Sequence, residues 1–271
     1  MNSDRNLLRF EPEEQYHSRS KSGECLSSHM LATFRKMPFK YYARITGLLE
    51  EPAKPEYIFG SAAHKLILEG TDAFDAAYTV SDGPINERTG KPYGKDTKVY
   101  ADWLSMQEGE VITTDDFNEI VSMNESILRH PEIPALLSGD GIAEGVVRAE
   151  VDGICCQIRM DYFDPEVGII DLKTCRDIEM FDHDMRSYGY IFNMAFYRRV
   201  MRELTGLNYP VYIVAVDKTP FHIAGYWHIP DAELDLAERI NTAAMNRLKE
   251  CREKSFFPTG FERKQIFTLN K

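Results

Sequence analysis

The chain has 271 residues, 43% of them hydrophobic, and its acidic side chains outnumber its basic ones to give a formal net charge of −11. This length and apolar content allow a large buried core, whereas the acidic balance argues against a protein that coats nucleic acid by charge alone. No apolar run is long enough for a transmembrane helix, and residues 1–15 are polar where a signal peptide would be apolar. We therefore expect a cytoplasmic protein with no membrane partner.

The first half of the chain is expected to be mainly helical. Residues 27–50 begin with a serine cap and carry a helical periodicity that Pro38 interrupts, which predicts two short helices. Further helices are expected within 59–70, closed by Gly70, and over 114–128, capped by Thr114 or Asp115. Between these two helices, the composition of 81–98 predicts a long loop.

From residue 142 the pattern changes to strands. Two runs, 142–151 and 154–163, flank an Asp152-Gly153 turn and predict a hairpin, and an apolar third strand follows over 167–173. The remaining expected elements are a long helix over 184–205 ending at Gly206, strands over 209–217 and 221–229, and a helix from 230 to about 252.

This order predicts an α/β fold, in which a mixed central sheet is flanked by helices and preceded by a helical N-terminal portion. We expect one domain over 1–271, made of a helical front and loop (1–140), an α/β catalytic core (141–258) and a tail (259–271).

The five cysteines are odd in number and show no C-x-x-C spacing. This pattern favours reduced, buried thiols over disulfides or a zinc site. The five are Cys25, Cys155, Cys156, Cys175 and Cys251.

Two carboxylates and one lysine are expected to meet at one edge of the sheet. Asp161 ends the second strand, and Asp171 and Lys173 share one face of the third with Ile169, because strand side chains alternate. Such a group is unfavourable to desolvate unless a cation or a phosphate joins it. The two aspartates could bind Mg²⁺ or Mn²⁺, with the Leu172 carbonyl as a further ligand and Lys173 acting on a water molecule. The alternative is structural: Asp161 caps a turn, and Asp171 pairs with Lys173.

The arrangement resembles the PD-(D/E)XK nuclease signature, with Met160-Asp161 in place of Pro-Asp, followed by Asp171-Leu172-Lys173. Other segments are similar to the RecE-type exonuclease VIII family of phage and prophage recombination systems. These are residues 27–43, 59–70, the Arg88-Thr89-Gly90-Lys91 loop and 187–199. The resemblance extends from about residue 26 to 230, which is most of the chain.

By position, the resemblance implies that His64 belongs to the metal site, although a lone histidine on a helix is also common as a structural residue. It also implies that Glu144 is the acidic residue of the first strand, with Glu150 as a weaker rival.

Three residues of the long helix are implied to belong to the catalytic site. Tyr190, Asn193 and Tyr197 fall on one helical face at spacings i, i+3 and i+7. Relatives usually carry glutamine where this chain has Asn193, so the polar group is one methylene shorter here.

The resemblance implies an exodeoxyribonuclease that uses Mg²⁺, or Mn²⁺, and resects linear duplex ends from the 5′ side to leave a 3′ single strand. The expected partners are double-stranded DNA ends, a RecT-like annealing recombinase, and further copies of the chain in a toroidal tetramer. ATP is not expected, because the sequence lacks a GxxxxGK[ST] loop.

Two alternatives remain open. A RecB-type repair or CRISPR-adaptation nuclease is one, although its iron–sulfur form needs a cluster of four cysteines. An inactive DNA-end-binding subunit is the other, and it would be expected to lack at least one of Asp161, Asp171 and Lys173.

Overall fold

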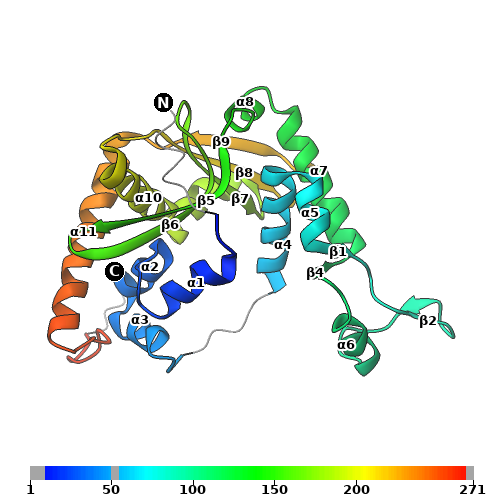
Figure 1. The fold of residues 1–271 in the computed structure, drawn as a ribbon, viewed down its shortest axis with the longest axis horizontal. Helices are drawn as coiled ribbons and strands as arrows, with labels where there is room; N and C mark the ends of the chain where they lie inside the picture. The colour runs from blue at the N-terminus through cyan, green and yellow to red at the C-terminus, as the bar shows by residue number, and fades with distance from the viewer. Residues whose placement is uncertain (1–9, 50–54, 267–271) are drawn as a thin grey trace.

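The computed structural model describes residues 10–49 and 55–266, and its core is a five-stranded mixed sheet in the order β5-β6-β7-β8-β9 (Figure 1). Neighbouring strands are antiparallel except for the parallel pair β7 and β8. The five strands are β5 (Ile142–Val151), β6 (Ile154–Asp164), β7 (Gly168–Cys175), β8 (Val211–Asp217) and β9 (Ala224–His228). The expected α/β fold with a mixed sheet is thus confirmed.

The hairpin of β5 and β6 follows from its turn residues. Asp152 and Gly153 both have positive φ, 49° and 78°, and the ladder begins directly beside them with the pair Val151 and Ile154. Two successive residues of positive φ make a turn whose twist matches that of the flanking strands. The predicted hairpin is therefore confirmed.

Helices cover both faces of the sheet. On one face, α10 (Tyr190–Thr205) packs against β5 and β6 and contacts α11 (Asp231–Glu253) and α2 (Ser28–Lys36). On the other, α4 (Pro55–His64) packs against β7, and α7 (Thr114–Arg129) against β8 and β9 (Figure 1). The sheet thus separates two hydrophobic cores, and β7 contributes to both. Ile169 lies in the core under α10, and Ile170 and Leu172 lie in the core under α4 and α7.

The helical front forms largely as its sequence predicts. Ser27 caps α2 by accepting the Met30 N–H at 3.4 Å, and Pro38 starts α3 (Pro38–Ile45) at a position where a missing N–H costs nothing. Helix α4 continues as the π-helix Lys65–Glu69 and stops at Gly70. The cap of α7 is Thr113, whose hydroxyl accepts the Asp116 N–H at 3.1 Å, so the expected cap at Thr114 or Asp115 was one or two residues late.

Several short elements are absent from the sequence prediction. Within the expected loop 81–98, β2 (Ile85–Asn86) and β3 (Lys91–Pro92) form a small hairpin. The region around β2 and α6 (Lys98–Leu104) projects from the body of the molecule (Figure 1). The remaining elements are α1 (Glu13–Lys21), α5 (Thr71–Ala77), β1 (Tyr78–Val80) paired in parallel with β4 (Glu110–Ile112), and α8 (Ile133–Leu137).

The long helix expected over 184–205 was wrong as a single element. A 3₁₀ turn (Ile178–Met180) leads into α9 (Phe181–Tyr188), Gly189 adopts the left-handed conformation at φ 73°, and α10 starts at Tyr190. A glycine takes this conformation without the steric penalty of a Cβ, so the chain turns between two helices. The predicted end at Gly206 is confirmed.

The expectation that all cysteines are reduced was wrong for one pair. Cys25 and Cys155, 130 residues apart in sequence, form a disulfide, whereas Cys156, Cys175 and Cys251 are buried free thiols. A short parallel bridge brings the pair together: Leu26 donates its N–H to the Cys155 carbonyl at 2.7 Å. The pairing of these backbones cannot be read from cysteine spacing. Within the described ranges, no helix is both long and apolar enough to cross a membrane.

Candidate metal centre

Glu144 and Asp161 face each other across the first two strands. The pairs on either side, Ala143 with Tyr162 and Gly145 with Met160, keep one register, so Glu144 lies opposite Asp161. Glu144 nevertheless has a φ of 56°, in the left-handed region that a residue with a Cβ rarely adopts in a strand. Such a conformation costs about 1–3 kcal/mol and is held where the surrounding structure imposes it, often at functional sites.

Asp161 is fixed by a backbone donor from the next strand. Regular pairing of β6 with β7 runs from Asp164 with Gly168 to Tyr162 with Ile170. Beyond it, the Leu172 N–H donates to Asp161 Oδ2 at 2.8 Å. The Asp161 carboxylate thus accepts the hydrogen bond that a backbone carbonyl of the partner strand would otherwise accept. This contact orients Asp161 toward the third strand.

Asp171 and Lys173 form an ion pair beside Asp161. Lys173 Nζ lies 2.6 Å from Asp171 Oδ2 and 3.7 Å from Asp161 Oδ2, and it donates to the Leu172 carbonyl at 3.1 Å. Asp171 is only 4% exposed, so its charge is desolvated and Lys173 is its one described ion-pair partner. The side-by-side placement of Asp171 and Lys173 agrees with the alternation of the strand.

The carboxylates here are buried and repel one another. Burial raises the pKa of Asp171 to about 6, against the opposing effect of Lys173, and the charge of Asp161 adds to the rise. Burial, followed by the charge of Asp161, raises the pKa of Glu144 to about 7. Burial alone would lower the pKa of Lys173, but Asp171 and Asp161 raise it above its ordinary value. The ammonium therefore stays charged, and the surplus of negative charge favours a cation.

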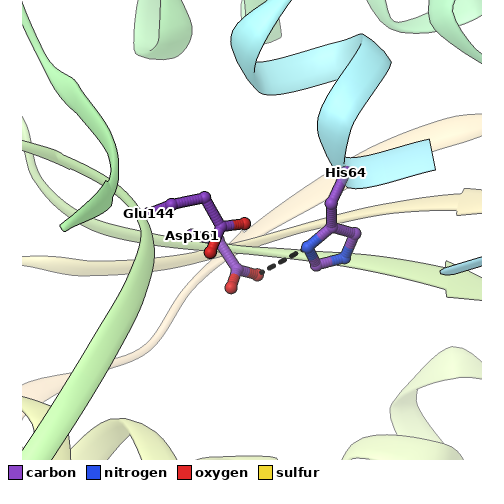
Figure 2. Close-up of side chains that lie close together, drawn as sticks. All are labelled: His64, Glu144 and Asp161. Carbon is purple, nitrogen blue, oxygen red and sulfur yellow. Dashed lines mark ion pairs between the residues drawn. The ribbon is translucent and has the colours of Figure 1, made fainter. Parts of the chain in front are cut away.

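His64, Glu144 and Asp161 bring their side chains together (Figure 2). One ligand atom from each lies within 4.8 Å of the other two, and His64 Nδ1 is 3.6 Å from Asp161 Oδ2. Partial burial lowers the pKa of His64 despite the nearby carboxylate, which favours the neutral imidazole that binds metals. Carboxylates and a neutral imidazole are common metal ligands, so this donor set fits a divalent cation.

The predicted ligands divide between this cluster and the ion pair. His64 and Asp161 lie in the cluster as expected, and Glu144 joins them directly, whereas Asp171 is engaged by Lys173. The Leu172 carbonyl faces the site, since it accepts from Lys173 and a Leu172 backbone hydrogen bond also affects the pKa of His64.

The three predicted residues of α10 lie at different depths. Tyr197 is buried and lines the cavity of the cluster, and this burial raises its pKa well above the ordinary value. The Tyr190 ring centroid is 5.6 Å from Lys173 Nζ, and burial raises the pKa of Tyr190 to about 12. Asn193 is half-buried, and no described hydrogen bond joins it to the cluster.

The sequence reasoning missed two contributors to this site. The cluster lines a cavity of about 190 Å³, room for several water molecules, and helix α1 adds Glu13 and Tyr16 to its wall. Arg159 Nε lies 2.6 Å from Glu144 Oε2, and its Nη1 lies 3.5 Å from Glu13 Oε2. Arg159 could have been found, because it precedes Asp161 by two residues and so shares its face of the strand. The position of α1 has no such local signal.

Helix α1 is docked on the sheet by a buried amide. Gln157 Nε2 donates to the Tyr16 carbonyl and to Ser20 Oγ, each at 2.7 Å, and Gln157 is fully buried. Arg148 forms a further ion pair with Glu11, just before the helix. These contacts place α1 beside the cluster.

Comparison with known proteins places most of the chain in one family. The model of the PDDEXK-like domain of unknown function (DUF3799) matches residues 27–269. Helix α1 lies outside that range. No curated protein matches the chain.

The fold is similar to the crystal structure of a candidate exonuclease from Eubacterium rectale, with a TM-score of 0.68 over 97% of both chains and 18% sequence identity. A likeness at this identity shows the fold alone. The match over most of its length shows that the chain belongs to the PDDEXK-like family DUF3799.

Proposed function

We propose that this protein is a divalent-metal-dependent deoxyribonuclease that hydrolyses phosphodiester bonds at the ends of linear duplex DNA. The observation that carries the proposal is the cluster of His64, Glu144 and Asp161 beside the ion pair of Asp171 and Lys173. Membership of a PDDEXK-like family supports nuclease chemistry, and the similarity to a candidate exonuclease supports action at ends.

His64, Glu144 and Asp161 would hold the metal, and a bound Mg²⁺ or Mn²⁺ supplies a Lewis acid together with a water molecule of lowered pKa. Lys173, which lies beside Asp171 and Asp161, is placed to donate a hydrogen bond to a phosphate oxygen or to the attacking water. Asp171 holds the Lys173 ammonium in place at 2.6 Å.

Arg159 orients one of the three ligands. Its guanidinium contacts the Glu144 carboxylate at 2.6 Å and keeps it directed at the cavity that Asp161 also lines. A fixed ligand loses less conformational entropy on binding the cation.

The finer assignment follows the resemblance to RecE-type exonucleases. We propose resection from the 5′ side, delivery of the 3′ strand to a RecT-like annealing recombinase, and a cytoplasmic location. A RecB-type repair or CRISPR-adaptation nuclease is the second candidate, since it uses the same superfamily site. An inactive end-binding subunit is disfavoured because Asp161, Asp171 and Lys173 are all present.

Cleavage of end-labelled DNA tests the proposal. Duplexes labelled at the 5′ or the 3′ end, a closed circle and single strands are incubated with Mg²⁺, with Mn²⁺ and with EDTA. We expect metal-dependent loss of linear duplex from the 5′ side, with the circle left intact. Cleavage of the circle would contradict action at ends, and the absence of metal-dependent cleavage on every substrate would contradict the nuclease.

We further propose that the active form is a ring of several copies. A body of net charge −11 attracts a polyanion weakly, and a closed ring retains a strand by topology instead. Light scattering gives the mass, and a time course on long duplex, chased with excess unlabelled DNA, gives processivity. A monomer that stops when the chase is added would refute the ring.

A further inference from the structure

Two tyrosines flank the break between α9 and α10. Tyr188 is the last residue of α9 and Tyr190 the first of α10, and the left-handed Gly189 between them turns the chain. This turn brings the two rings together, with centroids 5.7 Å apart and planes inclined by 35°. In one continuous helix, residues i and i+2 would point in different directions.

The inner ring of this pair packs against the core, and the outer ring is exposed. Tyr190 is half-buried and contacts Phe181 at 6.1 Å, and Phe181 in turn contacts Trp227 at 4.7 Å between ring centroids. Tyr188 adds its ring to the outer end of this aromatic row with 62% of its surface exposed. The row therefore continues from the core into solvent.

The inner ring also adjoins the candidate metal centre. Lys173 Nζ lies 5.6 Å from the Tyr190 ring centroid, and the same ammonium contacts Asp171 and Asp161. Tyr188 is thus one ring further out from the ion pair where we place the scissile phosphate. The distances from Lys173 Nζ to the Tyr190 ring centroid and from there to the Tyr188 centroid are 5.6 and 5.7 Å.

We propose that Tyr188 is a stacking platform for an unpaired or terminal base of the DNA strand that is cleaved. This inference rests on the proposed nuclease function. Aromatic side chains bind single strands by stacking on base faces, and this mode tolerates any sequence because every base has such a face. In a duplex those faces are covered by neighbouring base pairs, so the platform selects a frayed or single-stranded end.

One basic side chain lies close to the platform, on a helix whose first turn carries Asp182 and Asp184. Arg186 lies in the same last turn of α9 and is exposed, and it can meet the phosphates that follow the stacked base. Because the ring has only two side-chain torsions and rests on Tyr190, little conformational entropy is lost when a base stacks on it.

The test measures stacking directly on a single-stranded oligonucleotide that carries 2-aminopurine at its 5′ end. It compares Tyr188→Phe and Tyr188→Leu in an Asp161→Asn background, which prevents cleavage during the measurement. The matched control is Tyr57→Leu, since Tyr57 is 63% exposed and does not line the metal cavity. Stacking on an aromatic ring quenches 2-aminopurine fluorescence.

We expect Tyr188→Leu to lose the quenching and to bind on the order of ten times more weakly. Tyr188→Phe and Tyr57→Leu should behave like the parent. In the otherwise wild-type enzyme, Tyr188→Leu should raise KM more than it lowers kcat. A Tyr188→Leu variant that folds like the parent, by its melting temperature, and keeps the quenching would overturn the inference, as would a parent protein that shows no quenching.

The two proposals can fail separately. Metal-dependent cleavage by the wild type together with unchanged quenching in Tyr188→Leu would refute the platform alone. Quenching that depends on Tyr188, without cleavage under any metal condition, would refute the nuclease and leave a binding subunit. Loss of binding in Tyr188→Phe as well would mean that the hydroxyl, and not the ring face, makes the contact, which also overturns stacking.

Discussion

Replacing Asp161 by asparagine should abolish cation binding and leave the fold in place. The asparagine carbonyl can still accept the Leu172 N–H, which Asp161 Oδ2 accepts at 2.8 Å, so the strand geometry is kept. The lost negative charge removes a repulsion that raises the pKa of Glu144 and of Asp171, and it also removes an attraction to Lys173 at 3.7 Å. These effects oppose each other, so the metal-free stability should change by about 1 kcal/mol or less.

The effect on the metal-bound state should be larger. At a cation concentration one hundred times its dissociation constant, binding to the folded state alone stabilises the wild type by about 2.7 kcal/mol. For a domain of this size, that corresponds to a rise of roughly 5–10 °C in Tm. Asp161→Asn removes one of the three grouped ligands and should lose most of this rise, together with cleavage.

Thermal unfolding with and without Mg²⁺, combined with calorimetric titration, checks both parts on one preparation. Asp75→Asn is the matched control, because it makes the same chemical change at an exposed position of α5. An Asp161→Asn protein that keeps the full Mg²⁺-dependent rise in Tm would refute the assignment of Asp161 as a ligand.

Further predictions concern the neighbours of Asp161. His64→Ala should cut the cleavage rate strongly with little change in the metal-free Tm, whereas a histidine that only packs the core would show the reverse in the same two assays. Lys173→Ala should abolish cleavage and lower the free energy of unfolding by up to about 3 kcal/mol, because Asp171 loses its ion-pair partner. Denaturant titration measures the loss, and Lys173→Arg, which keeps the charge, is the matched variant. The pKa of Glu144 is about 7 in the folded protein, above its ordinary value of 4.5, so its ionisation destabilises the metal-free fold as pH rises between these values. Because a cation binds the ionised carboxylate, Mg²⁺ should raise Tm more at pH 8 than at pH 5.5. An equal rise at both pH values would contradict this. Gln157→Leu should destabilise the protein by about 2–4 kcal/mol, since the acceptors on α1 lose their donor, and hydrogen exchange should then show faster exchange in α1 than elsewhere.

Local chemistry in the sequence was enough to predict the main frame of the fold. Ser27 caps the helix that follows it, Pro38 starts the next helix, and Asp152-Gly153 forms the turn between two strands. The alternation of Ile169, Asp171 and Lys173 against Ile170 and Leu172 separates the two cores because successive strand side chains point to opposite faces. Each of these signals acts within a few residues.

The helix break at Gly189 shows the limit of such signals. A single glycine is tolerated inside a helix, so the periodicity on both sides predicted one continuous element. The structure shows that Gly189 is left-handed instead, which brings Tyr188 beside Tyr190.

What the sequence by itself determined was the strand–turn–strand core, the side of the sheet that carries Asp171 and Lys173, and the family resemblance of its motif. The tertiary structure showed how His64 of α4 and the left-handed Glu144, which the family resemblance implied, meet at Asp161, and it alone decided that helix α1 joins them, with its disulfide-linked connection to β6. The physical reason is that these contacts join segments from 17 to 130 residues apart, between Glu144 and Asp161 at the near end and Cys25 and Cys155 at the far end. Their formation depends on how whole helices pack onto both faces of the sheet, and no short stretch of sequence contains that information.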